Sequence, residues 1–247
     1  MNYYNEIDPY CVEWLQNLVL AGLIPPGKID IRPIEQVHPN DLKGFTQCHF
    51  FCGIGGWIRA LQLAGWPEDR EIWTGSCPCQ PFSVAGKSGG EEDERHLWPF
   101  WERLIWAREP AKVAGEQVAS KSGREWLAGV RVDLGELGYE VGAVDLPSAC
   151  VGAQHIRQRL WWVADSSSTR LAGSVRERSG VRVQPQETPT KRSHPSVSKG
   201  LFNVPHPRHL PSPYGIPRPV GQVRAYGNSI VPQVAAEILK AWMSARL

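Results

Sequence analysis

Short apolar runs alternate along the chain with longer segments whose apolar residues recur every three or four positions, the pattern of a sheet built from βα units. The apolar runs predict strands at residues 3–7, 29–34, 46–51, 71–75, 112–115, 140–146 and 160–164. The periodic segments predict helices at residues 9–21, 55–64, 96–109, 123–137 and 232–246. We therefore expect an α/β fold with an open, doubly wound, mostly parallel sheet, which binds ligands at the carboxyl ends of its strands.

The composition is that of a folded protein, with 247 residues of which 42% are hydrophobic. The charge is nearly balanced, at 27 Lys and Arg against 25 Asp and Glu, which argues against a histone-like polycation. No apolar run approaches the ~20 residues that span a bilayer, and the first residues lack a secretory signal, so we expect no membrane association and a cytoplasmic location. The six scattered cysteines are expected to be thiols.

Basic charge is concentrated in residues 166–224, which carry ten Lys and Arg against two acids and nine of the 21 prolines. Little helical or strand periodicity is visible there, so the segment is expected to be irregular. A basic irregular segment indicates a polyanionic partner. A solvated linker with incidental charge is an equal alternative from composition alone.

The first candidate site is an apolar strand that runs through Phe51 into Gly53, Ile54, Gly55 and Gly56 and then into a helix. Glycines at such a turn let the backbone approach a ligand and direct helix N-terminal amides towards it. A plain tight turn is an equal alternative.

The second candidate site is a loop in which Pro78 and Pro81 bracket Cys79 and exclude regular secondary structure around it. Such a loop can present a thiol nucleophile to a substrate. A zinc site on Cys77 and Cys79 is disfavoured, because Cys-x-Cys lacks the usual spacing and no second ligand pair follows.

These two segments resemble motifs I and IV of the DNA cytosine-5 methyltransferase family, of bacterial or phage type. Residues 115–118 resemble the family's Glu-Asn-Val motif, with Gln117 in place of Asn, and residues 227–230 resemble its C-terminal Gly-Asn-Ser motif. Residues 152–159 resemble its Gln-x-Arg-x-Arg motif, with His155 where the first Gln is usual. The resemblance covers nearly everything except residues 166–224 and implies a Rossmann-like methyltransferase sheet.

The resemblance also implies a reaction, in which S-adenosyl-L-methionine methylates a cytosine of double-stranded DNA. Cys79 would add to carbon 6 of the base, which makes carbon 5 nucleophilic enough to take the methyl group. Glu116 would act as a carboxylic acid at nitrogen 3, Arg159 would hold the carbonyl oxygen, and Arg157 would support the catalytic loop. The base would have to be flipped out of the duplex, at a cost of roughly a few kcal/mol.

The cofactor-binding residues follow from the same resemblance. Motif I, motif IV and the C-terminal motif supply Phe51, Gly53, Ile54, Gly55, Gly56, Pro78, Asn228 and Ser229. Cys79 follows Phe51 by only 28 positions, although the family usually places two cofactor strands in that interval. Upstream, residues 4–8 resemble motif II and residues 26–31 a motif III, which adds Glu6, Ile7, Asp30 and Ile31. The alternative for Glu6 and Asp30 is that they are ordinary surface acids.

This motif order predicts a permuted connectivity. Strand 3–7 should lie between strand 29–34 and strand 46–51, parallel to the latter, because the pocket depends on spatial adjacency and not on chain order. Glu6 should then lie beside Phe51 and Gly53 and bind the ribose of the cofactor.

The chain is expected to divide into a catalytic and cofactor-binding core at 1–165, a short basic target-recognition-like segment at 166–224, and a C-terminal motif and helix at 225–247 that return to the core. No metal and no obligate protein partner are evident. Alternatives are a tRNA cytosine methyltransferase of the same family, a non-catalytic DNA-binding remnant, and a thiol redox or metal protein built on Cys77 and Cys79. The target sequence, and a role in restriction or in phage self-protection, are left open.

Overall fold

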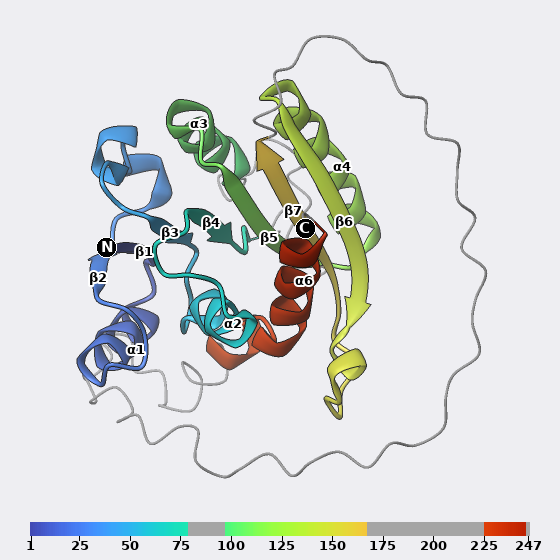
Figure 1. The fold of residues 1–247 in the computed structure, drawn as a ribbon, viewed down its shortest axis with the longest axis horizontal. Coiled ribbons are helices and arrows are strands. Elements are labelled where there is room, and N and C mark those ends of the chain that lie inside the picture. The colour runs from blue at the N-terminus through green and yellow to red at the C-terminus, as the bar shows by residue number, and fades with distance from the viewer. Residues whose placement is uncertain (79–96, 167–224, 246–247) are drawn as a thin grey trace, which may run out of the picture.

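The computed structural model describes residues 1–78, 97–166 and 225–245, which form one α/β body (Figure 1). Every predicted strand and helix is present. The strands are β1 Asn2–Asn5, β2 Gly27–Asp30, β3 Gln47–Phe50, β4 Ile72–Gly75, β5 Lys112–Val118, β6 Tyr139–Pro147 and β7 Gln158–Ser166. The helices are α1 Pro9–Leu20, α2 Gly56–Ala64, α3 Trp98–Arg108, α4 Lys121–Glu136 and α6 Pro232–Ser244, with short 3₁₀ turns η1 Ile34–Gln36, η2 Pro39–Leu42 and η4 Ser148–Val151.

Two of the predicted features lie outside this part of the chain. Cys79 belongs to residues 79–96, and the basic segment, apart from Ser166 at the end of β7, belongs to residues 167–224. Among the residues that the structure describes, no helix is both long and apolar enough to cross a membrane.

The strands form one seven-stranded sheet in the order β2-β1-β3-β4-β5-β7-β6. The first five strands are parallel to one another, and β7 runs antiparallel to both of its neighbours. The predicted doubly wound, mostly parallel sheet is therefore confirmed. If β3 is counted as the first strand, the parallel part follows the order 3-2-1-4-5 of doubly wound folds.

The predicted position of the N-terminal strand is also confirmed, because β1 pairs in parallel with β2 on one side and with β3 on the other. Tyr4 is opposite Ile29 of β2 and His49 of β3. That this order permutes the methyltransferase motifs stays a prediction, since it also requires that β1 and β2 bind the cofactor.

Helices cover both faces of the sheet, because successive strand side chains point to opposite faces. On one face Tyr3 and Phe50 pack with η1, η2, α3 and α4 around a group of tryptophans that includes Trp101 and Trp162. On the other face Tyr4 packs with α1 and the start of α2, and α6 packs beside α2 (Figure 1). Helix α6 lies against β4, β5 and β7, and Tyr226, which precedes it, packs edge-on against Trp14 of α1.

The connections between parallel strands do not all have the same hand. The connections β1–α1–β2 and β3–α2–β4 lie on the same face but run in opposite directions along the sheet, so their hands are opposite. The connection from β2 to β3 through η1 and η2 crosses the other face and shares the hand of β1–α1–β2. Since about 98% of such crossovers are right-handed, we infer that β3–α2–β4 is the left-handed exception.

Local sequence signals explain where the helices begin. Asp8 caps α1 by accepting hydrogen bonds from the backbone N–H groups of Tyr10 and Cys11, and Pro9 occupies the first helical position. Ser120 caps α4 in the same way, through the N–H of Gly123. These caps satisfy N–H groups that the helices themselves leave without partners.

A histidine lies at the centre of the sheet. His49 of β3 is 0% exposed, its Nδ1 lies 2.7 Å from the Thr74 hydroxyl, and its ring stacks on Tyr4 at 5.5 Å. Within the described residues its Nε2 has no hydrogen-bond partner. Complete burial disfavours the charged imidazolium and lowers the pKa of His49 to about 3.

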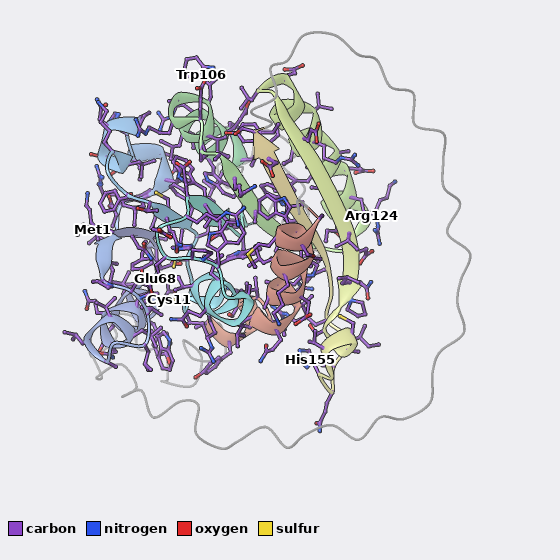
Figure 2. All side chains as sticks on the ribbon, in the orientation of Figure 1. Met1, Cys11, Glu68, Trp106, Arg124 and His155 are labelled. Carbon is purple, nitrogen blue, oxygen red and sulfur yellow. The ribbon has the colours of Figure 1, made fainter. Side chains whose placement is uncertain are left out.

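We expect His49 to make the protein sensitive to acid. Its pKa lies below the usual value of 6.5, so its contribution is fully present above pH ~6.5 and is lost as the pH falls towards ~3. The free energy of unfolding, measured with urea, should fall by up to about 1.4 kcal/mol per pH unit in this window relative to His49→Gln. The His155→Gln variant, changed at an exposed position (Figure 2), should lose unfolding free energy in parallel with the wild type. If the unfolding free energies of the wild type and His49→Gln changed in parallel with pH, the His49 ring would not titrate as expected.

Candidate active site

The carboxyl ends of β1, β3, β4 and β5 meet at one edge of the sheet, where the helix that follows β3 and the helix that follows β4 lie on opposite faces. A small pocket lies at this edge. It is lined by residues from the loop after β3, from α2, from the end of β4 and from the segment before α6: Phe51, Cys52, Gly53, Gly56, Trp57, Ser76, Asn228, Ser229 and Ile230. The structure thus brings together motif I and the C-terminal motif, which are far apart in sequence.

The loop after β3 has the left-handed backbone that its glycines allow. Gly53 has a φ of 55°, and a Cβ atom added there would meet no atom of the described residues within 4 Å. Phe51 also has a positive φ, 49°, which is costly for a residue with a side chain. Its ring packs edge-on against Trp101 at 6.1 Å, while Ile54 packs against the cluster under α1.

Glu6, directly after β1, joins this loop to the neighbouring strand. Its Oε2 accepts the N–H of Gly53 at 2.6 Å, and its Oε1 accepts the N–H groups of Ile7 and Asp8 at 2.9 Å. Burial raises the pKa of the Glu6 carboxyl, and the three N–H donors oppose that rise. The predicted placement of Glu6 beside Gly53 is confirmed.

Asp30, the last residue of β2, differs from Glu6 in that its pKa is lowered. Its carboxylate accepts hydrogen bonds from the Tyr3 hydroxyl at 2.9 Å and from Nε of Arg32 at 3.0 Å. Burial opposes its ionisation, but the Arg32 hydrogen bonds outweigh burial and hold the pKa at about 2. These partners engage both carboxylate oxygens, so its contact with adenine stays a prediction. Ile7 and Ile31, beside these acids, are 59% and 64% exposed.

Glu116 and Arg159 face each other on β5 and β7. The Nε of Arg159 lies 2.7 Å from Oε1 of Glu116, and Glu116 is only 7% exposed. Burial raises the pKa of Glu116 above its usual value, although Arg159, Arg157 and Ser76 act in the other direction. The predicted partners are therefore brought together, and the acid form is favoured relative to a glutamate in water.

Gln117 holds the segment that leads to the catalytic loop. Its Nε2 donates to the carbonyl of Cys77 at 3.2 Å, and its Oε1 accepts the N–H of Val118 at 2.9 Å. The Cys77 side chain is 3% exposed and belongs to the core, whereas Pro78, the last residue before Cys79, is exposed. Gln117 thus anchors the backbone two residues before the candidate nucleophile.

Arg157 contacts the C-terminal motif. Its predicted support of the catalytic loop concerns residues 79–96, outside the described part of the chain, and stays a prediction. Its guanidinium donates to the carbonyls of Gly227 at 2.8 Å and Ser229 at 2.6 Å, so it holds the C-terminal motif. Its φ of 37° is strained for a residue with a side chain. Burial, reinforced by the charge of Arg159, lowers its pKa.

Sequence reasoning missed two residues at the site, Trp57 and Ser76. The indole Nε1 of Trp57 donates to Oγ of Ser76 at 3.1 Å, which links the start of α2 to the end of β4. Their positions next to the motif glycines and the proline-cysteine loop were the available signal. Within the described ranges, no group of three His, Cys, Asp or Glu side chains is placed to hold a metal ion.

This arrangement defines a class of protein. A glycine loop at the switch point of a doubly wound sheet, with a carboxylate at the adjoining strand end, is the geometry of nucleotide-type ligand sites in α/β proteins. A buried acid paired with an arginine lies a short distance along the same edge.

Comparison with known proteins identifies the family. Residues 54–209 match the C-5 cytosine-specific DNA methylase family, so the chain belongs to that family. Type II methyltransferase M.AluI of Cellulosimicrobium cellulans is 27% identical over 168 residues, which are 60% of this chain and 32% of that protein. Type II methyltransferase M.NgoMIV of Neisseria gonorrhoeae is 31% identical over 114 residues, 45% of this chain and 36% of that protein. The chain spans about a third of the length of these curated relatives.

Two solved structures resemble this chain at low sequence identity. A mutant of Spodoptera frugiperda DNMT2 has a TM-score of 0.44 and 14% identity, with 72% of this chain and 53% of that chain covered. An Escherichia coli structure described as a prophage-encoded DNA modification methyltransferase has a TM-score of 0.42 and 15% identity, with 70% of this chain and 49% of that chain covered.

Gly56 permits the close approach of the C-terminal motif, and a side chain there should disturb it. A Cβ atom at Gly56 would lie 2.7 Å from Cγ1 of Ile230. We expect Gly56→Ala to lower the free energy of unfolding by roughly 1–3 kcal/mol, as overpacking does. Gly129→Ala, in helix α4 with no atom within 4 Å, should be neutral or stabilising by up to ~1 kcal/mol. Urea unfolding would measure the change in unfolding free energy for both variants. Equal changes would contradict the close contact between Gly56 and Ile230.

Proposed function

We propose that this protein is an S-adenosyl-L-methionine-dependent methyltransferase that modifies carbon 5 of cytosine in double-stranded DNA. The buried pair of Glu116 and Arg159, at the same sheet edge as the glycine loop, carries the proposal. Family membership supports the reaction class. The substrate, the cofactor and the covalent cysteine mechanism are the parts that we propose.

The residues at the pocket fit this cofactor. A carboxylate has about four acceptor sites, and Glu6 uses three of them on backbone N–H groups, which leaves capacity for a ribose hydroxyl. The exposed side chains of Ile7 and Ile31 suit the faces of adenine, and the open side of Gly53 gives room for close backbone approach. Asn228 and Ser229 would close the pocket from the other side. When bound, S-adenosyl-L-methionine supplies an electrophilic methyl group.

The remaining chemistry concerns the cytosine ring. The thiolate of Cys79 would form a bond to carbon 6 while the Glu116 carboxylic acid gives its proton to nitrogen 3, so that no full negative charge accumulates on the ring. Burial keeps Glu116 closer to the acid form that this step needs. Arg159 would hold the carbonyl oxygen of the base. Once carbon 5 has taken the methyl group and S-adenosyl-L-homocysteine remains, loss of the carbon 5 proton to water would expel the Cys79 thiolate, and nitrogen 3 would return its proton to Glu116.

A methyl-transfer assay tests the proposal. The full chain would be incubated with tritiated S-adenosyl-L-methionine and either duplex DNA, single-stranded DNA or tRNA. We expect label in duplex DNA at carbon 5 of cytosine. Label in tRNA alone would make the protein a tRNA methyltransferase, and label in none of them, with DNA still bound, would make it a non-catalytic DNA-binding protein.

Cys79→Ser should abolish methyl transfer and leave cofactor binding nearly intact, because the thiolate attacks the base and has no part in the cofactor pocket. Cys77→Ser is the matched control, and its effect should be far milder. Methyl transfer and calorimetric cofactor binding measure the two properties. Equal loss from both substitutions would indicate a shared metal or disulfide role.

The basic segment 166–224 should bind DNA mainly through phosphates, since it carries ten Lys and Arg against two acids. Affinity measured by fluorescence anisotropy should then fall steeply between ~50 and ~200 mM salt. The double variant Lys191→Gln, Arg192→Gln should reduce the slope of log affinity against log salt by about 1 per lost contact. A salt-independent affinity would remove the basis for this role.

A further inference from the structure

The C-terminal motif, residues 227–230, forms part of the wall of the pocket at the sheet edge. Asn228 and Ser229 line this pocket together with the loop after β3, and Asn228 is exposed, so its side chain is available to a bound ligand. In the chain the motif is separated from β7 by residues 167–224, which lie outside the described part. The contacts that hold it at the pocket come from residues that are distant in sequence.

Apolar contacts hold the two ends of the motif. Just before it, the ring of Tyr226 packs edge-on against Trp14 of α1 at 6.4 Å. At its end, Ile230 is 7% exposed, and its Cγ1 would lie 2.7 Å from a Cβ atom placed on Gly56. The residues in between, 227–229, are small or polar, and apolar packing alone does not fix how their backbone turns.

Arg157 holds this middle part of the motif. Its Nη2 donates to the carbonyls of Gly227 at 2.8 Å and Ser229 at 2.6 Å, the residues on either side of Asn228. Hydrogen bonds from a charged donor are roughly twice as strong as those between neutral groups. One nitrogen thus brings both carbonyls together and fixes the turn that carries Asn228.

The backbone that carries Arg157 is itself fixed. Ser148 of η4 donates its N–H to the carbonyl of Ile156 at 2.6 Å and its hydroxyl to the carbonyl of Arg157 at 3.4 Å. Arg157 has a φ of 37°, a left-handed conformation that persists only where the surrounding structure imposes it. Val151, also in η4, packs against the apolar cluster of α2 and α6. The guanidinium therefore projects from a well-anchored part of the chain.

Arg157 lies two positions before Arg159, whose Nε contacts Glu116 at 2.7 Å. One short segment therefore carries both the arginine of the buried acid pair and the arginine that holds the pocket wall. The two arginines face different parts of the site, since Arg159 meets the acid and Arg157 meets the C-terminal motif.

We propose that Arg157 is a positioning residue for cofactor binding, which holds the turn around Asn228 in the place that a bound cofactor needs. This inference rests on the proposed function, because it takes the pocket to be the cofactor site. It gives Arg157 an effect on cofactor affinity, beyond the support of the catalytic loop that the family resemblance implies. The contact with the C-terminal motif is a property of the protein alone, so it can also be measured without cofactor.

The first measurement is calorimetric binding of S-adenosyl-L-homocysteine, which has the adenosine and amino acid parts of the cofactor, to the full chain. Arg157→Met keeps a long side chain but removes every donor. We expect its Kd to rise about tenfold, equivalent to ~1.4 kcal/mol, because the turn around Asn228 is no longer held at the pocket.

The second measurement is hydrogen–deuterium exchange of residues 225–231 in the absence of cofactor. The N–H of Ser229 donates to the carbonyl of Ala225 at 3.1 Å within this segment, so its exchange reports local opening. Exchange should become faster in Arg157→Met. Arg157→Lys keeps the charge and can donate to one of the carbonyls, so both of its effects should be smaller than those of Arg157→Met.

Arg103 on α3 provides a matched control. It too donates from Nη2 to two backbone carbonyls, those of Glu35 at 3.4 Å and Val37 at 2.9 Å, and neither residue lines the pocket. Arg103→Met therefore removes equivalent hydrogen bonds elsewhere in the fold. It should change neither the Kd for S-adenosyl-L-homocysteine nor the exchange of residues 225–231.

An unchanged Kd in Arg157→Met, with or without faster exchange, would overturn the proposal, and so would an equal rise in Arg103→Met. If Arg157→Met does not fold, Arg157→Lys is compared with Arg103→Lys by the same two measurements. If the wild type binds no S-adenosyl-L-homocysteine but exchange of residues 225–231 still responds to Arg157→Met, the proposed function is rejected and Arg157 is left with the positioning of the C-terminal motif alone.

Discussion

The carboxylate of Glu6 is the contact on which the candidate site depends. It accepts the N–H groups of Ile7 and Asp8, which follow β1, and the N–H of Gly53 in the loop after β3, so one side chain holds the loops that follow these two strands. Without it these N–H groups would lose their acceptor, at a cost of about 1–3 kcal/mol for each one that is buried. The same bonds place a carboxylate beside the glycine loop, where a ribose would need it.

The fold was predictable because its elements are short and strongly patterned. The run around Tyr3 and Tyr4 reads as a buried strand, and all four residues of β1 are buried. The extent of β5 was underestimated, because Glu116 and Gln117 are polar and made the strand seem to end at Gly115. They are nonetheless paired with Trp161 and Leu160 of β7, and the pairing continues to Val118.

Sequence reasoning could identify the site residues whose type alone suits the proposed chemistry. It was less successful where the neighbours of a side chain in the folded protein determine its role. Glu116 and Arg159 were identified through the family resemblance, and the folded chain brings their side chains together. Arg157 binds the carbonyls before α6, and Asp30 is engaged by Arg32, because these partners lie within hydrogen-bonding distance only in the folded chain. Trp57 and Ser76 were missed for the same reason, as spacing along the chain does not reveal a bond between α2 and β4.

The left-handed connection β3–α2–β4 bears on how the molecule reaches this structure. A rewired chain in which α2 led into β1, and η2 led into β4, would preserve every strand pairing while giving the usual hand to these connections. In the actual order β1 and β2 are made first and pair with each other, and β1 must then accept β3 as its second neighbour after the chain has crossed over it. Strand pairings that close late and with the disfavoured hand slow the search for the native topology. We therefore expect this chain order to slow folding, an effect that the packing of the finished sheet does not reveal.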